Sequence, residues 1–113
     1  MPQHDDIVRL RHVLEYAREA LDLIKGKQRA DLEADRMLEL ALTRLLEIVG
    51  EAANRVSEER REEYPQIPWR QIVGLRHRLI HGYDAVDLDI LWDIIEQDLP
   101  PLIAALERIV EGK

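Results

Sequence analysis

The sequence contains no cysteine and no phenylalanine, and no apolar run approaches the roughly 18 residues of a membrane-spanning helix. Without cysteine the chain can form neither disulfide bonds nor thiolate metal sites. The first ten residues, MPQHDDIVRL, lack the apolar core of a signal peptide. We therefore expect a protein without membrane association that is located in the cytoplasm.

An excess of basic residues is also absent. The 113 residues include 23 acidic and 16 basic side chains, which gives a formal net charge of -7. Domains that bind nucleic acid over a broad surface are typically basic, so any contact with RNA or DNA must be local. Because 46% of the residues are apolar, the chain is not expected to be disordered. Its length fits one domain, which we place at 1–113.

The apolar residues recur in steps of three and four, which is the period of helices with one buried face. This pattern predicts helical segments over about 5–25, 30–56, 68–80 and 87–110. The abundance of leucine and alanine favours the same structure, and no sustained alternation predicts a strand. With short connections between the segments, we expect an all-α fold, an antiparallel up-and-down bundle of four to five helices.

Several residues mark features within these segments. Asp5 or Asp6 can cap the first helix by accepting hydrogen bonds from its free N–H groups. Gly50 lies within the second segment at a cost of about 1 kcal/mol relative to alanine, so we expect another backbone to approach it closely. Pro100 and Pro101 interrupt the fourth segment and predict a kink or two helices in tandem.

The stretch GLRHRLIHGY, residues 74–83, concentrates basic and titratable side chains in this acidic chain. Residues 69–83 contain three arginines and no acidic residue, a formal charge of +3. An arginine can hold a phosphate through two parallel hydrogen bonds. His81 is expected at a helix C-terminus, where the partial negative charge favours the imidazolium form, and a histidine suits general acid–base chemistry.

These residue types fit the cleavage of RNA without a metal ion. The 2′-hydroxyl attacks its own phosphate, so the reaction needs one base and one cation rather than a protein nucleophile. His81 and Arg76 could fill these two roles. The spacing alone also fits a purely structural interpretation. In that interpretation the basic last turn complements the helix dipole, Gly82 ends the helix and Tyr83 packs on the bundle.

A metal site is the other chemistry that the stretch could suggest. His77 and His81 are four residues apart, a spacing that can bind zinc on a helix. No carboxylate lies between them, and two ligands are too few for a stable site. We therefore predict neither a metal ion nor another cofactor.

The sequence RHRLIHGY has the pattern arginine, four residues, histidine, one residue, tyrosine, which resembles the signature of HEPN-domain ribonucleases. The wider context resembles the HepT-like family, formerly DUF86. It comprises IVGEAANRVSEE (48–59) and YPQIPWRQIVGLRHRLIHGYDAVDLDILWDIIEQDLPPL (64–102). The resemblance covers the second half of the chain, whereas the first half matches only as amphipathic helix.

The resemblance implies a four- to five-helix toxin that forms a homodimer, in which two motifs face each other across a cleft and cut RNA without metal. In this family pattern Arg76 and His81 are the catalytic pair. Tyr83 is the residue to which the antitoxin, a minimal nucleotidyltransferase of the MntA type, transfers AMP from ATP. The implied partners are a second copy of the chain, this antitoxin and RNA.

Four further residues are candidates for supporting roles, namely His77, Arg78, Glu51 and Asn54. His77 stands where the family often has asparagine or aspartate, and this departure could preserve a polar role or alter the rate and substrate. Glu51 and Asn54 could support the motif from a neighbouring helix or form only a polar helix edge. The alternative function is a non-catalytic helical module that binds a nucleotide or a nucleotidyltransferase.

Overall fold

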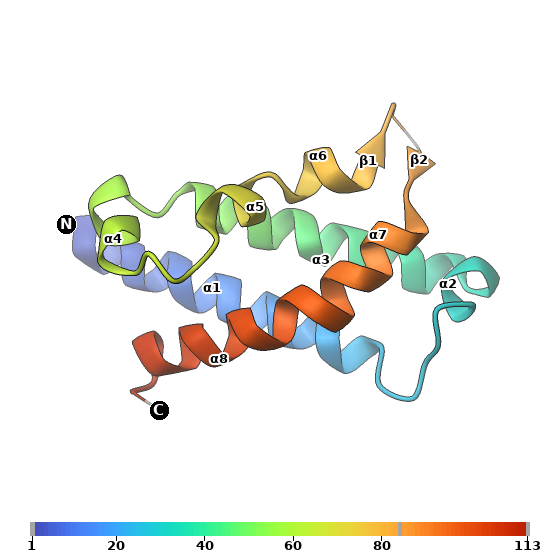
Figure 1. Ribbon diagram of the computed structural model, residues 1–113, viewed down its shortest axis with the longest axis horizontal. Helices are drawn as coiled ribbons and strands as arrows, with labels where there is room; N and C mark the ends of the chain where they lie inside the picture. Colours follow the sequence, from blue (N-terminus) through green and yellow to red (C-terminus); the bar gives the residue numbers. More distant parts are fainter. Residues whose placement is uncertain (1, 84, 113) are drawn as a thin grey trace.

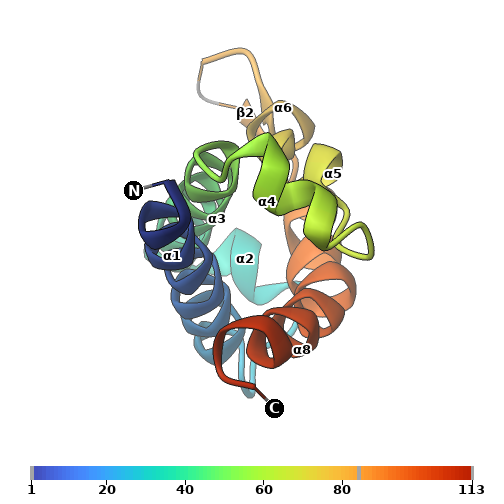
Figure 2. The same cartoon turned by 90° about the vertical axis from the view of Figure 1, so that its left-hand side faces the viewer.

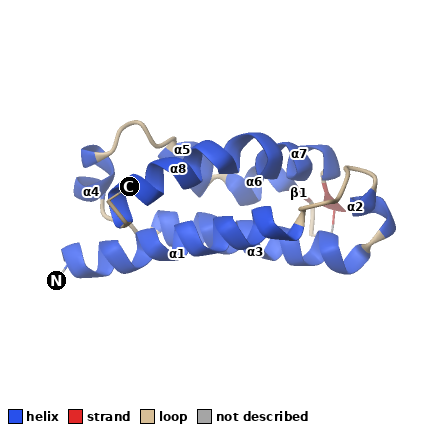
Figure 3. Cartoon of the chain, turned by 90° about the horizontal axis from the view of Figure 1, so that it is seen from below, coloured by secondary structure: helices blue, strands red, loops and turns tan. Residues whose placement is uncertain are grey.

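The computed structural model describes residues 2–83 and 85–112, and successive long segments run in alternate directions along its long axis (Figure 1). The helices α1 (Pro2–Leu23) and α3 (Arg36–Asn54) pack side by side, and α8 (Leu99–Val110) covers another side of α1 (Figure 2). Helices make up most of the described chain, and loops and one small hairpin make up the rest (Figure 3). The predicted all-α fold class is confirmed.

Shorter elements connect these long helices and close the bundle. They are α2 (Asp31–Ala34), α4 (Glu58–Glu63), α5 (Trp69–Val73), α6 (Leu75–Leu79), β1 (Ile80–His81), β2 (Ala85–Val86), α7 (Leu88–Asp93) and the π-helix η1 (Ile94–Asp98). Both α5 and α6 pack against α3. Among the described residues, no helix is both long and apolar enough to cross a membrane.

Leucines of the predicted apolar stripes form the centre of the core. Leu10 and Leu14 of α1, Leu42 and Leu46 of α3 and Leu106 of α8 are all almost completely buried. Each such side chain contributes roughly 1.5–3 kcal/mol by leaving water. The apolar stripes therefore determine which faces of the long helices pack together. The shorter elements pack on these long helices.

Three of the predicted segments are interrupted. In the second, Asp35 ends α2 and caps α3, because its carboxylate accepts a hydrogen bond of 3.0 Å from the N–H of Leu38. The third divides into α5 and α6 at Gly74. In the fourth, Pro100 and Pro101 are the second and third residues of α8. The turn before them widens into η1, in which the N–H of Leu99 donates to the carbonyl of Ile94.

The close approach predicted at Gly50 is confirmed. A Cβ atom on Gly50 would lie 3.0 Å from the carbonyl oxygen of Ile72, which is tighter than almost all real contacts of this kind. The glycine therefore lets α5 pack directly on the backbone of α3. This contact sets the position of α6, which follows α5 after a single residue.

Asp6 does not cap the first helix, which begins upstream at Pro2. Its carboxylate is buried and accepts hydrogen bonds from the backbone N–H and the hydroxyl of Ser57, at 2.9 and 2.6 Å. Burial alone would raise the pKa of Asp6, but the hydrogen bonds from Ser57 and the charge of Arg60 outweigh it and lower the pKa below its usual value. Asp6 thus ties α1 to the start of α4.

Candidate functional site

The motif residues are divided between α6 and the small β-hairpin that follows it. Arg76 and His77 lie on α6, whereas His81 lies in β1. The two strands are antiparallel, and Gly82 has a φ of +80°, a conformation that glycine adopts without steric cost. Tyr83 is 96% exposed, on the hairpin that projects from the bundle (Figure 1).

His81 is not in a helical turn, as the sequence suggested, because α6 ends at Leu79. Its Nε2 atom lies 3.9 Å from Oδ2 of Asp87. The other carboxylate oxygen of Asp87 accepts a hydrogen bond of 3.0 Å from the N–H of Ile90 and caps α7. The distance of 3.9 Å is too long for a hydrogen bond, so Asp87 lies near the imidazole of His81 without holding it.

Arg76 is directed toward α3. Its Nη1 atom lies 3.6 Å from Oε2 of Glu47, and 70% of its side chain is exposed. A long ion pair between groups in contact with water contributes little to stability. The guanidinium of Arg76 can therefore leave Glu47 for a phosphate without disturbing the fold.

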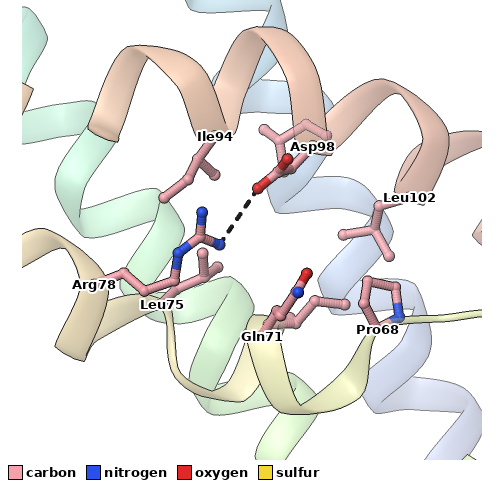
Figure 4. Close-up of a pocket in the computed structure, with 9 residues that line it drawn as sticks. Pro68, Gln71, Leu75, Arg78, Ile94, Asp98 and Leu102 are labelled. Atoms are coloured by element: carbon pink, nitrogen blue, oxygen red, sulfur yellow. Dashed lines mark hydrogen bonds and ion pairs between the residues drawn. The ribbon is translucent and has the colours of Figure 1, made fainter. Parts of the chain in front are cut away.

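Arg78 lies on the other side of α6. Its Nη1 atom is 3.3 Å from Oδ2 of Asp98 in η1, beside an apolar cavity that Leu75 and Ile94 help to line (Figure 4). Two residues along a helix correspond to a rotation of about 200°, which explains why Arg76 and Arg78 point to opposite sides. The structure thus separates Arg78 from the residue that it was predicted to support.

Two adjoining hollows lie between α3 and the segment that carries the motif. The first, of about 220 Å³, we call the Asn54 hollow, and it is lined by Glu47, Gly50, Glu51, Asn54, Val73, Arg76 and His77. The second, of about 400 Å³, we call the Arg44 groove, and its lining includes Arg36, Glu39, Thr43, Arg44, Glu47, Arg76 and Tyr83. Because Glu47 and Arg76 line both, Arg76 stands where the two hollows meet.

The two hollows bring together most of the predicted site. Glu51, Asn54 and His77 line the same hollow as Arg76, and Tyr83 lines the groove on its other side. His81 lines neither hollow. It pairs with Ala85 in the hairpin, and successive strand residues face opposite ways. The catalytic pair inferred from the sequence is therefore not gathered around one hollow of a single chain.

Several residues of the groove were not predicted from the sequence, among them Arg36, Thr43, Arg44 and Glu47. A signal for them was present, because they are spaced by seven, one and three residues and so share one face of α3. That signal marks only a polar helix face until α6 and the hairpin are packed over it. Among the side chains that the structure describes, those of residues 5–83 and 85–112, no three histidines or carboxylates are arranged to hold a metal ion.

A helical bundle with an exposed arginine, a histidine–carboxylate pair and a projecting tyrosine defines a small all-α protein with a candidate phosphate-binding site. The model of the family described as ribonuclease HepT-like matches residues 13–109, and the chain belongs to this family. The match includes nearly all of the first half, which had resembled the family only as amphipathic helix.

Curated relatives extend over almost the whole chain. A Methanocaldococcus jannaschii protein named "Putative RNase MJ1380" is 34% identical over 109 residues, which are 96% of this chain and 100% of the relative. A Thermococcus cleftensis protein named "Probable ribonuclease HepT" is 35% identical over 100 residues, 85% of this chain and 91% of the relative. No solved structure matches the chain.

Proposed function

We propose that the protein is an endoribonuclease that cuts RNA without a metal ion. His81 accepts the proton of a 2′-hydroxyl, whose oxygen attacks the adjacent phosphorus. The bond from phosphorus to the 5′-oxygen breaks, and this oxygen takes a proton from solvent. Arg76 stabilises the additional negative charge on the phosphorane. The products are a 2′,3′-cyclic phosphate and a 5′-hydroxyl.

The placement of Arg76 is the observation that carries this proposal. The residue is exposed, it forms a long ion pair of 3.6 Å with Glu47, and it stands between two hollows large enough to admit parts of a nucleotide chain. Family membership and the ribonuclease names of the relatives support the same activity. Asp87 lies 3.9 Å from His81, and a modest movement would let its carboxylate orient the imidazole.

The test compares the purified protein with His81→Ala and Arg76→Ala on RNA in excess EDTA. We expect cleavage by the parent and a large loss in both variants. Equal cleavage by all three proteins would remove the catalytic assignment. Cleavage by the parent only after addition of a divalent metal would remove the metal-independent mechanism.

We also propose that the active form is a homodimer with a cleft shared by two motifs. In one chain His81 lines neither hollow that contains Arg76, so a second copy offers a way to complete the site. Met37 and Leu40 are large apolar residues that remain exposed on α3, and Leu40 lines the Arg44 groove. A monomer by light scattering, at the concentration where RNA is cut, would contradict the shared cleft.

For regulation we propose a toxin–antitoxin system in which an MntA-type nucleotidyltransferase modifies Tyr83. The phenolic oxygen attacks the α-phosphorus of ATP, pyrophosphate leaves and the phenolic proton is lost. Tyr83 is fully accessible, and it lines the same groove as Arg76, so an attached adenylate would place bulk and negative charge there. Incubation with the antitoxin and ATP should add adenylate mass. Modification that persists in Tyr83→Phe would refute this residue as the target.

The position of His81 also favours a second candidate function, a non-catalytic module that binds a nucleotide or a nucleotidyltransferase. In this case the hollows around Arg76 would serve binding alone, and His81 would have no reacting partner. Stable binding to the nucleotidyltransferase by a parent protein that leaves RNA intact would favour this function over catalysis.

A further inference from the structure

The Arg44 groove contains a buried polar atom without a partner. Thr43 is only 8% exposed, and its Oγ1 atom makes no hydrogen bond to the described chain. The hydroxyl of a threonine in a helix commonly donates a hydrogen bond to the carbonyl four residues earlier. The Thr43 hydroxyl does not make this bond. Leaving a buried hydroxyl unpaired is costly, and a bound ligand is one way to satisfy it.

Three arginines line the same groove as Thr43, and each forms only a long ion pair. Arg36 lies 3.4 Å from Glu39, and Arg44 lies 3.5 Å from Glu51, in both cases between a guanidinium Nη1 and a carboxylate Oε1. Both arginine side chains are mostly exposed, as is that of Arg76. Pairs of this kind are weak in water, so a phosphate can compete for the guanidinium groups.

Arginines outnumber carboxylates in the lining of the groove, although the chain as a whole is acidic. Arg36, Arg44 and Arg76 share this lining with the carboxylates of Glu39 and Glu47. Both glutamates are largely covered, with 12% and 17% of their side chains exposed, whereas the arginines extend into solvent. Arg44 also pairs with Glu51, which lies outside the lining and is 61% exposed. An incoming anion therefore meets the guanidinium groups before it meets the carboxylates of Glu39 and Glu47, and at Arg44 it replaces the exposed carboxylate of Glu51.

The spacing of the arginines favours an extended ligand over a single anion. Arg36 and Arg44 are eight residues apart on α3, or about 12 Å along the helix axis. The exposed ring of Tyr83 adds an aromatic surface to the same groove. Cationic side chains beside an aromatic ring are the usual arrangement for binding single-stranded nucleic acid, in which phosphates contact the cations and a base stacks on the ring.

We propose that the Arg44 groove binds the backbone of single-stranded RNA on one side of the bond that is cut. Arg36 and Arg44 hold successive parts of the phosphate backbone, and the Thr43 hydroxyl donates a hydrogen bond to the strand. This inference rests on the proposed function, because it takes the phosphate at Arg76 as the reacting one. It adds a binding subsite on α3 to the residues of the motif.

The experiment measures the binding of a fluorescently labelled single-stranded RNA of mixed sequence, about twenty nucleotides long, by anisotropy over a range of KCl concentrations. All proteins carry His81→Ala so that the RNA stays intact. In Arg36→Gln and Arg44→Gln, the slope of log Kd against log salt should become shallower by about 0.7 per arginine, because fewer counterions are released. Arg108→Gln, on the exposed side of α8, is the matched control and should leave the slope unchanged.

Thr43→Val separates the hydroxyl from charge and from packing. The variant keeps the shape of the side chain, so Kd should weaken about two- to tenfold through the lost hydrogen bond. The salt slope should stay the same, since a hydroxyl releases no counterion. The midpoint of thermal unfolding should not fall, because a methyl group replaces an unpaired buried hydroxyl.

Each outcome bears on the inference separately from the proposed function. An unchanged Kd and salt slope in the Arg36→Gln, Arg44→Gln double variant would overturn the inference, as would a parent protein that binds no RNA. If the protein with His81 intact cuts RNA, but the groove substitutions leave Kd and the salt slope unchanged, only the inference fails. If binding depends on the groove but the wild-type protein never cuts RNA, the proposed function fails and the subsite remains.

Discussion

Arg76 and Arg78 are two residues apart on α6, and they serve different sides of the molecule. Arg76 reaches over α3 into two open hollows, where it is mostly exposed and loosely held. Arg78 reaches Asp98 beside the apolar contact between α6 and η1 (Figure 4). The basic stretch is continuous in the sequence, but α6 directs its arginines to two different sides. We call the side of Arg76, toward α3, the groove side, and the side of Arg78, toward η1, the frame side. Basic residues that are neighbours in the sequence therefore need not belong to the same binding site.

The division also shows how the groove side is positioned. The segment that carries Arg76 is fixed by packing contacts, which include the close packing of α5 on Gly50, a residue that also lines the Asn54 hollow. Changes on the groove side should alter chemistry and leave stability nearly constant. Changes on the frame side should do the reverse, and a residue that belongs to both sides should affect both.

The largest effect is expected from His81→Ala. Loss of the general base should slow RNA cleavage by about 10²- to 10⁴-fold. The free energy of unfolding should stay within about 0.5 kcal/mol of the parent, because the side chain is mostly exposed. Single-turnover cleavage and urea unfolding measure the two quantities. A variant that cleaves normally, or that is strongly destabilised, would break the distinction between the two sides.

Asp6→Ala tests the frame side. The change leaves the N–H and hydroxyl of Ser57 without their acceptor and should lower the free energy of unfolding by about 3 kcal/mol at neutral pH. Cleavage by the fraction that stays folded should be nearly unchanged. Calorimetry combined with activity per folded molecule is the measurement.

The pH dependence of stability provides a second measurement on Asp6. The pKa of Asp6 is lower in the folded protein than in the unfolded chain. Its ionised carboxylate therefore stabilises the fold fully above the unfolded pKa, and this stabilisation disappears as the pH falls through the folded pKa. Asp6→Asn should lose less stability than the parent over that acidic range. Parallel curves for the two proteins would contradict the role given to the carboxylate.

Gly50→Ala should affect both sides. The added Cβ would lie 3.0 Å from the carbonyl oxygen of Ile72, so α5 must shift at a cost of about 1–3 kcal/mol. Cleavage should fall as well, because the shift moves the segment that carries Arg76. Glu51→Ala, in the same hollow but without this overlap, should change stability by no more than about 0.5 kcal/mol. Equal stability of the two variants would show that α5 can move away from the added Cβ atom without a cost in the free energy of unfolding.

The smallest effect is expected for the Arg78–Asp98 pair. Both side chains are partly in water, with exposures of 39% and 48%, so a double-mutant cycle with alanine should give a coupling energy of about 0.2–1 kcal/mol. Unfolding in urea measures it. A coupling well above this range would mean that the pair acts as a buried clamp.

The long helices could be predicted from the sequence because each has an apolar stripe of several turns. The close contact at Gly50 could also be predicted, since a glycine within a helix is costly without such a reason. The hairpin could not, because β1 and β2 contain two residues each and leave no alternating pattern. As a result, His81 was expected in a helix that ends before it.

The groove side was only partly predictable for a related reason. The motif identified Arg76 and Tyr83, but Thr43 and Arg44 belong to the site through the packing of α6 and the hairpin on α3. The same holds for Asp6, whose partner Ser57 is 51 residues away along the chain. Contacts between distant segments leave no local pattern in the sequence. The polar face of α3 could therefore be recognised, but the elements that pack beside it could not.

The most direct test of the central claim is to measure RNA cleavage by Arg76→Ala and Arg78→Ala side by side, in excess EDTA and under single-turnover conditions. Both changes remove one arginine from the same short helix and lower the net charge equally. We predict that Arg76→Ala is slower than the parent by at least about a hundredfold, whereas Arg78→Ala stays within a few fold. Equal losses in the two variants, or a loss confined to Arg78→Ala, would contradict the assignment of the groove side to function.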